Sequence, residues 1–162
     1  MKALTKVALL TLLGAGAGIL VAYYQYLAMT PDVAEALLAQ LGSLEMLFLV
    51  SGLQTAALTA VAAAVGFKLR KKLDLPEAKM PDRSGILAAL AIGFASSLVI
   101  TLSEKYIFLQ YLPADMGRFS FSPLYFSAAI LYGGIIEEVL LRLGLMTVLL
   151  WLFTGSERKR DV

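Results

Sequence analysis

Residues 7–29 read VALLTLLGAGAGILVAYYQYLAM, an uncharged apolar stretch long enough to cross a lipid bilayer. The hydrocarbon core of a bilayer is about 30 Å thick, so a spanning α-helix needs about 20 apolar residues. Three more stretches meet this requirement, at 44–67, 85–104 and 124–153. The first run continues well past the small residues 15–17, which favours a retained helix over a cleaved signal peptide. The sequence predicts an all-α helix bundle with four transmembrane helices.

The composition supports a membrane protein. The 162 residues are 59% hydrophobic and 16% charged, whereas a soluble domain is about 45–50% apolar and about 25% charged. The chain has no Cys, which excludes thiol chemistry, and no His, which removes the commonest general base and metal ligand. The net charge of +2 is too balanced to indicate nucleic-acid binding.

The segments outside the predicted spans are alternately rich and poor in basic residues. The segment 68–83 carries six Lys and Arg residues, and further bases precede residue 7 and follow residue 153. The segment 30–43 has acidic residues and no base, and the segment 105–123 has few bases. Because Lys and Arg accumulate on the cytoplasmic side, we expect both termini and the 68–83 loop to be cytoplasmic. The predicted location is a bacterial cell membrane.

Local signals predict where the helices begin. Thr30 precedes Pro31, and apolar residues then recur every four positions up to residue 41, which is typical of a short amphipathic helix lying in the membrane interface. Ser84 is the expected cap of the third span, and Ser122, followed by proline, is the expected cap of the fourth. The Pro-containing stretch 74–84 divides the hairpins without making separate domains, so residues 1–162 form a single predicted domain.

Gly14 and Gly18 form a G-x-x-x-G pattern within the first span. This pattern lets a second helix approach closely in a membrane. The alternative is that the two glycines have no specific partner.

Three charges interrupt the fourth span near its middle: Glu137, Glu138 and Arg142. Each charge costs about 2.5–3.5 kcal/mol at the centre of a bilayer. The segment therefore inserts only if the charges pair, face the bundle interior or reach water. An ionisable residue at this depth is a functional-site hypothesis by default.

The spacing of these charges predicts a division of roles. Glu138 and Arg142 stand four residues apart, so they share one helix face and can form an ion pair that acts as a structural clamp. Glu137 points about 100° away, and the nearby glycines at 133 and 134 leave room beside it. A free, desolvated carboxylate suits a general base or a proton carrier. The alternative is that all three charges pair with one another and with Gln54.

The motif Gly134-Ile-Ile-Glu137-Glu138-Val-Leu-Leu-Arg142 resembles the E-E-x-x-x-R motif of CAAX-protease and bacteriocin-processing intramembrane metalloproteases, also called Abi proteins or type II CAAX prenyl endopeptidases. The resemblance implies that the chain is similar to the N-terminal part of such a domain. It implies hydrolysis of a peptide bond in a membrane-associated peptide or protein. The implied catalytic residues are Glu137, which activates water, and Glu138 with Arg142, which hold the site.

The family completes its site with histidines in F-x-x-x-H and H-x-x-x-N/D motifs on later helices, and this implies a zinc cofactor. This chain contains neither motif. We therefore expect either a truncated part of a longer enzyme or a degenerate member, inactive by itself in both cases. One alternative is a non-catalytic membrane protein that binds a peptide partner, as in bacteriocin immunity. Another is a proton- or cation-coupled transporter that uses Glu137 as its carrier.

Two weaker features have structural interpretations. Glu104 and Lys105 are adjacent near the end of the third span, and we expect them to anchor it at the interface. The aromatic residues are expected to form a belt at the outer boundary; they are Tyr23, Tyr24, Tyr26, Tyr106, Tyr111, Tyr125 and Phe126.

Overall fold

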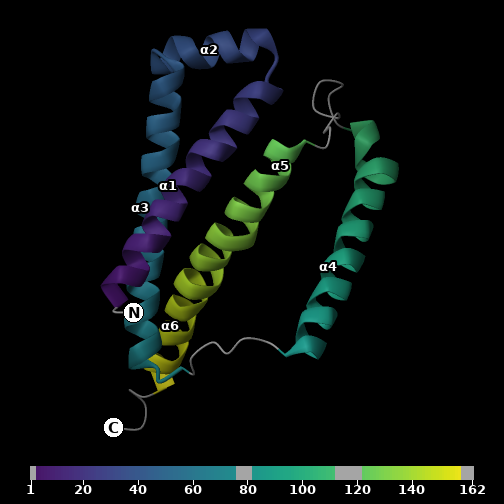
Figure 1. The fold of residues 1–162 in the computed structure, drawn as a ribbon. Helices are drawn as coiled ribbons and strands as arrows, with labels where there is room; N and C mark the ends of the chain where they lie inside the picture. Colours follow the sequence, from purple (N-terminus) through teal and green to yellow (C-terminus); the bar gives the residue numbers. More distant parts are fainter. Residues whose placement is uncertain (1–2, 76–81, 112–121, 158–162) are drawn as a thin grey trace. The chain divides into compact units, whose positions relative to one another are not determined.

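The computed structural model describes residues 3–75, 82–111 and 122–157, with side chains up to residue 154 in the last range (Figure 1). Every regular element in these ranges is a helix, which confirms the predicted all-α fold. The first four helices are α1 (Ala3–Ala28), α2 (Pro31–Leu41), α3 (Leu44–Lys72) and α4 (Arg83–Ser103).

Three described helices are long and apolar enough to cross a membrane. They are Ala3–Ala28, Leu44–Lys72 and Arg83–Tyr111, and they coincide with the first three predicted spans. The third includes a π-helical segment, η1 (Glu104–Phe108), and a 3-10 turn, η2 (Leu109–Tyr111), beyond α4. The helix therefore continues past residue 104, where the predicted span ends, through Lys105 to Tyr111.

The predicted fourth span is a run of four helical segments in immediate succession (Figure 1). They are α5 (Pro123–Ala128), η3 (Ala129–Ile136), η4 (Val139–Met146) and α6 (Thr147–Glu157). Both η3 and η4 are π-helical, so Glu137 and Glu138 lie between two wide stretches of helix.

The chain divides into two units, residues 1–75 with 121–162 and residues 76–120. In the first unit, the three-helix unit, α1 packs antiparallel to α3, and the run from α5 to α6 packs against both (Figure 1). Segment η3 contacts α1, whereas η4 and α6 contact α3. The second unit contains α4 with η1 and η2.

Small residues form the contact between α1 and α3. A Cβ atom added to Gly14 would lie 2.6 Å from Oγ1 of Thr59, and one added to Gly18 would lie 2.5 Å from the carbonyl oxygen of Ser51. Both distances are too short for any side chain, so the predicted close approach at G-x-x-x-G is confirmed. Thr59 is fully buried, and its hydroxyl donates to the carbonyl of Thr55 at 2.7 Å.

A second small-residue contact joins α3 to the last helical run. A Cβ atom added to Gly66 would overlap the carbonyl of Leu143, and one added to Gly144 would lie 2.9 Å from the Cβ of Ala62. Lipid tails are as apolar as leucine, so helices in a membrane associate through close van der Waals packing rather than through burial of large apolar groups. Small residues therefore occupy the inside of the three-helix unit.

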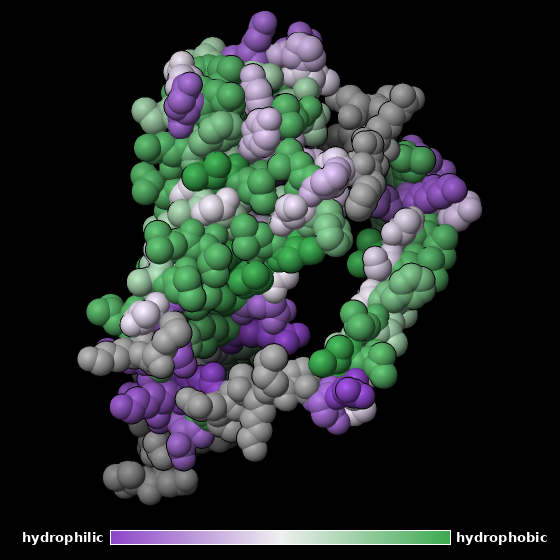
Figure 2. Space-filling view, in the orientation of Figure 1, coloured by the Kyte–Doolittle hydropathy of each residue, from purple (hydrophilic) through white to green (hydrophobic). Residues whose placement is uncertain are grey.

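Large apolar side chains lie on the outside. Leu12 is 71% exposed and Val61 is 64% exposed, and green, hydrophobic side chains cover most of the visible face of the three-helix unit (Figure 2). Among the described residues, Ile136 and Thr59 are the largest fully buried side chains. This inside-out distribution suits a protein whose surroundings are lipid.

The predicted helix starts have mixed outcomes. Ser122 caps α5 as predicted, because its Oγ accepts from the Tyr125 amide at 3.1 Å. Residues 31–41 form the predicted short helix α2. Thr30 occupies the cap position of α2, but its side chain makes no capping hydrogen bond. Proline at the first helical position itself favours the start, since its φ angle is already helical and it lacks an amide that needs a partner.

The predicted cap of the third span was wrong. Asp82, not Ser84, is the cap of α4: its Oδ1 accepts from the Gly85 amide at 2.9 Å. The Ser84 hydroxyl instead donates to the other carboxylate oxygen at 2.8 Å. The Gly85 amide and then the Ser84 hydroxyl stabilise the charged carboxylate and hold the pKa of Asp82 below its ordinary value. A carboxylate offers two acceptor oxygens, whereas the serine hydroxyl offers one.

The two ends of the three-helix unit differ in chemistry. At one end, the Lys6 Nζ lies 5.9 Å from the centre of the Phe67 ring, and the Lys72 Nζ lies 5.3 Å from the Trp151 ring. At the other end, aromatic rings meet across helices: Tyr23 with Phe48 at 5.9 Å, and Tyr24 with Tyr125 at 5.0 Å. A basic end and an aromatic end are the pattern expected at two membrane interfaces.

Candidate charged site

The predicted ion pair is present. Arg142 Nε lies 2.9 Å from Oε2 of Glu138, one helical turn away. The Arg142 side chain is 79% exposed and the Glu138 side chain is 49% exposed. The pair therefore lies on the surface of the three-helix unit, not in the contact between its helices. An exposed pair of this kind contributes about 0–1 kcal/mol in water.

Glu137 is the free carboxylate of the cluster, as its position in the helix predicts. Its side chain is exposed and makes no ion pair with another described residue. One carboxylate oxygen lies 3.8 Å from the position that a Cβ on Gly133 would occupy, so the side chain extends back along the helix over this glycine. A Cβ on Gly134 would meet open space. The glycines leave a gap beside Glu137 that another group can fill.

The alternative of a wider polar network is not seen among the described residues. Gln54 is exposed on α3, and no hydrogen bond joins it to either glutamate in the described part of the chain. Gln54 faces a different site, a polar cavity.

The side chains at this site differ from those that zinc requires. Zinc is held by His, Cys and carboxylate, with three or four protein ligands. The chain has no His or Cys, and no group of three potential ligands gathers within the described ranges. Arg142 also occupies one oxygen of Glu138 and places a positive charge beside it. The residues at this site do not fit the zinc ion that the family resemblance implies.

A polar cavity of about 200 Å³ lies between α1, α3 and η3. Its hydrogen-bonding side chains come from all three segments: Gln25 from α1, Ser51, Gln54 and Thr55 from α3, and Tyr132 from η3. Among the described residues, the amides of Gln25 and Gln54 and the hydroxyl of Tyr132 make no hydrogen bond to one another or to another residue. Unbonded amide and hydroxyl groups can donate to and accept from water or a neutral ligand, so this cavity is suited to water or a neutral polar ligand.

Sequence reasoning missed this cavity as a site. Gln25 and Gln54 are amide side chains within otherwise apolar spans, and this was a signal that could have been used. Tyr132 gave no such signal, because a single tyrosine within a predicted span does not by itself indicate a polar site. Its position beside the two glutamines depends on how η3 packs against α1.

Glu104 and Lys105 lie in the second unit, at the start of η1, and both are exposed. The Lys105 Nζ lies 5.4 Å from the centre of the Tyr106 ring. An adjacent cation and aromatic ring suit a membrane interface, and the anchoring role stays a prediction.

Comparison with known proteins adds no relative. No protein-family model, no curated protein and no solved structure matches this chain.

Proposed function

We propose that this chain is a multi-pass cell-membrane protein that contributes one part of a CAAX-protease-like site for peptide-bond hydrolysis. The observation that carries the proposal is the exposed face formed by Glu137, Glu138 and Arg142 on the three-helix unit. A charge facing lipid is costly, and this cost falls when another polypeptide covers the face. We infer that the covering polypeptide also supplies the histidines that the chain lacks.

In this proposal each charged residue has a separate task. Glu137 accepts the proton of a water molecule that attacks the peptide carbonyl, because it is the carboxylate without an ion-pair partner. Glu138 and Arg142 hold each other at 2.9 Å and fix the local charge. The gap at Gly133 and Gly134 admits the substrate backbone or the covering helix.

The first test is proteolysis. The chain is reconstituted in liposomes with a membrane-anchored peptide, with and without zinc, and cleavage is followed by mass spectrometry. We expect no cleavage by the chain alone, because it has no imidazole to share the proton. Metal-dependent cleavage by the chain alone, abolished in Glu137→Ala, would contradict the proposal. It would show that hydrolysis does not need groups from a second polypeptide.

The second test identifies what covers the charged face. A photo-crosslinking residue at Gly134 is used in native membranes, with the same probe at the exposed position Gly16 as the control. We expect a specific adduct at Gly134 whose purified complex cleaves the membrane-anchored peptide and loses this activity in Glu137→Gln. An adduct whose complex is inert, or equal labelling at both positions, contradicts the proposal.

The proposed topology has four spans with both termini in the cytoplasm. Its structural support is the grouping of Lys6, Lys72 and Trp151 at one end of the three-helix unit. The chain lacks Cys, so single cysteines can be placed at Gln40, Leu75 and Tyr111 without background. An impermeant maleimide added to intact cells should label positions 40 and 111 and not position 75; labelling of position 75 would reverse the orientation.

A second candidate function is peptide binding without catalysis, and the polar cavity favours it. Two amides and three hydroxyls with no charge suit the backbone of a peptide segment. The two functions separate by mutation. Gln54→Leu should weaken peptide binding if the polar cavity holds the peptide, and should leave binding unchanged if the peptide lies in the gap beside Glu137.

A further inference from the structure

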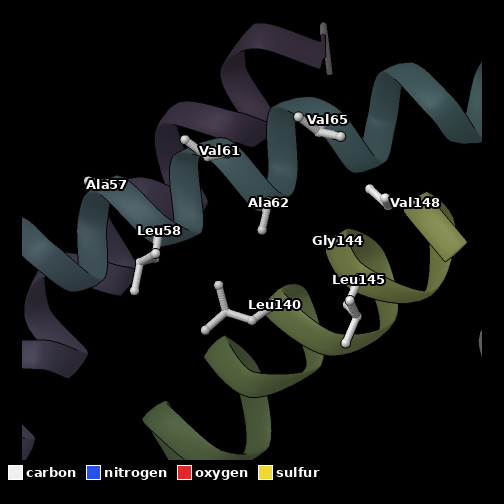
Figure 3. A pocket seen from close by; sticks show the side chains of 9 residues that line it. All are labelled: Ala57, Leu58, Val61, Ala62, Val65, Leu140, Gly144, Leu145 and Val148. Atoms are coloured by element: carbon white, nitrogen blue, oxygen red, sulfur yellow. The ribbon is translucent and has the colours of Figure 1, made fainter.

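An apolar groove of about 430 Å³ runs along the three-helix unit between α3 and the η4–α6 segment (Figure 3). Its floor is made of small residues, because Gly144 lies against Ala62 and leaves no room for a Cβ atom. Leucine and valine side chains from the two helices form its walls (Figure 3). The lining residues are Ala57, Leu58, Val61, Ala62, Val65, Leu140, Gly144, Leu145 and Val148.

One end of this groove is basic. Lys68 and Lys72 follow Val65 by three and seven residues, so they continue the same face of α3 beyond the lining residues. Both lysines are exposed. The seven steps from Leu58 to Val65 extend about 10 Å along the helix, and the lysines stand within two further turns.

An indole lies opposite these lysines. Trp151 follows Val148 by three residues and so continues the groove face of α6. The Lys72 Nζ lies 5.3 Å from the centre of its ring. Tryptophan is enriched where hydrocarbon meets headgroups, so this end of the groove has the residues of a membrane interface.

We propose that the groove binds an anionic phospholipid, with an acyl chain along the apolar lining and the phosphate at Lys68 and Lys72. An acyl chain fills an apolar groove in the bilayer, and juxtamembrane lysines attract anionic headgroups. A second copy is a poorer occupant: a copy related by a two-fold axis along the membrane normal would bring the same basic end against itself. This inference does not depend on the proposed function.

Lipid binding is measured by native mass spectrometry of the detergent-purified chain. Phosphatidylglycerol and phosphatidylcholine with identical acyl chains are titrated separately, so that the two probes differ in headgroup charge. We expect phosphatidylglycerol to bind more tightly. Each lysine should contribute about fivefold, so Lys68→Gln with Lys72→Gln should lower the affinity by about 25-fold, while phosphatidylcholine is little affected.

Lys6→Gln is the matched control for the lysine variants. It removes a charge at the same end of the unit, but Lys6 contacts Phe67, which lies on the face of α3 away from the groove. We expect this variant to bind phosphatidylglycerol as the parent does. If Lys6→Gln, Lys68→Gln and Lys72→Gln each lower the phosphatidylglycerol affinity equally, general charge attraction explains the binding. This result would overturn the proposed site.

Groove-filling variants test the acyl-chain part of the proposal. Val61→Phe and Leu145→Phe enter the groove from its two walls, and Leu12→Phe, on the exposed face of α1, is the control. We expect both groove variants to release both lipids and the control to retain them, with helix content unchanged by circular dichroism. Equal binding by parent and both groove variants overturns the proposal. A lipid-free dimer that Val61→Phe disrupts also overturns the proposal, because the groove would then bind a second copy of the chain.

Discussion

The α1–α3 interface and the charged face of the run from Pro123 to Glu157 meet the same apolar surroundings in opposite ways. The interface uses Gly14, Gly18 and Thr59 to bring two backbones together, and the Thr59 hydroxyl bonds a carbonyl of its own helix. The charged face presents Glu137 and an ion pair on the surface. The first region therefore makes its close contacts within the unit, whereas the second leaves its charged side chains exposed.

The largest effect is expected at the α1–α3 interface. Gly18→Leu should lower the free energy of unfolding by more than the 1–3 kcal/mol usual for overpacking, because its Cβ would already lie 2.5 Å from a carbonyl oxygen of α3. Gly16→Leu is the control, since a Cβ at Gly16 meets open space. Denaturant titration in micelles measures both, and equal stability of the two variants would show that the close contact is absent.

The start of the charged helical run gives the next largest effect. Ser122→Ala should cost about 1 kcal/mol, because it removes the acceptor of the Tyr125 amide. Thr30→Ala should cost less, since the Thr30 side chain makes no capping bond at the start of α2. Both are measured by the same titration. If Thr30→Ala lowers the free energy of unfolding more than Ser122→Ala does, the prediction is wrong.

The ion pair between Glu138 and Arg142 should contribute no more to stability than the Ser122 cap. Arg142→Leu in micelles should lower the free energy of unfolding by about 1 kcal/mol or less, because the pair is exposed. Glu138→Gln combined with Arg142→Gln should restore part of that loss. A loss of about 3–5 kcal/mol, typical of breaking a buried pair, would show that the charged face is already covered in the purified protein.

The smallest expected effect lies outside both regions, at the start of α4. The pKa of Asp82 is lowered in the folded protein, so its capping stabilises the helix above the unfolded value of about 3.9 and is lost as the pH falls through the lower folded value. The protection factor of the Gly85 amide, which compares its hydrogen exchange with that of an unstructured amide at the same pH, should therefore fall at acid pH. Asp82→Asn keeps an acceptor without the charge, and its exchange should lack this acid-dependent component.

Much of the charged site follows from sequence spacing alone. The four-residue separation of Glu138 and Arg142 predicts their ion pair, and the one-residue offset predicts that Glu137 stands apart. The exposure of the pair does not follow, because periodicity tells which residues share a face and not which face meets a neighbour. The same limit explains why the polar cavity was missed: its residues come from three segments far apart in the chain.

By itself, the sequence determines the all-helical fold, the three membrane-length helices and the pairing of charges within one helix. These depend on local hydrophobic length and on the fixed geometry of a helical turn. The tertiary structure decided that Gly14 and Gly18 face α3 and that a groove with a basic end lies beside Trp151. These depend on which faces meet, and in a membrane that is decided by the close fit of small residues rather than by hydrophobicity, which is nearly the same on every face.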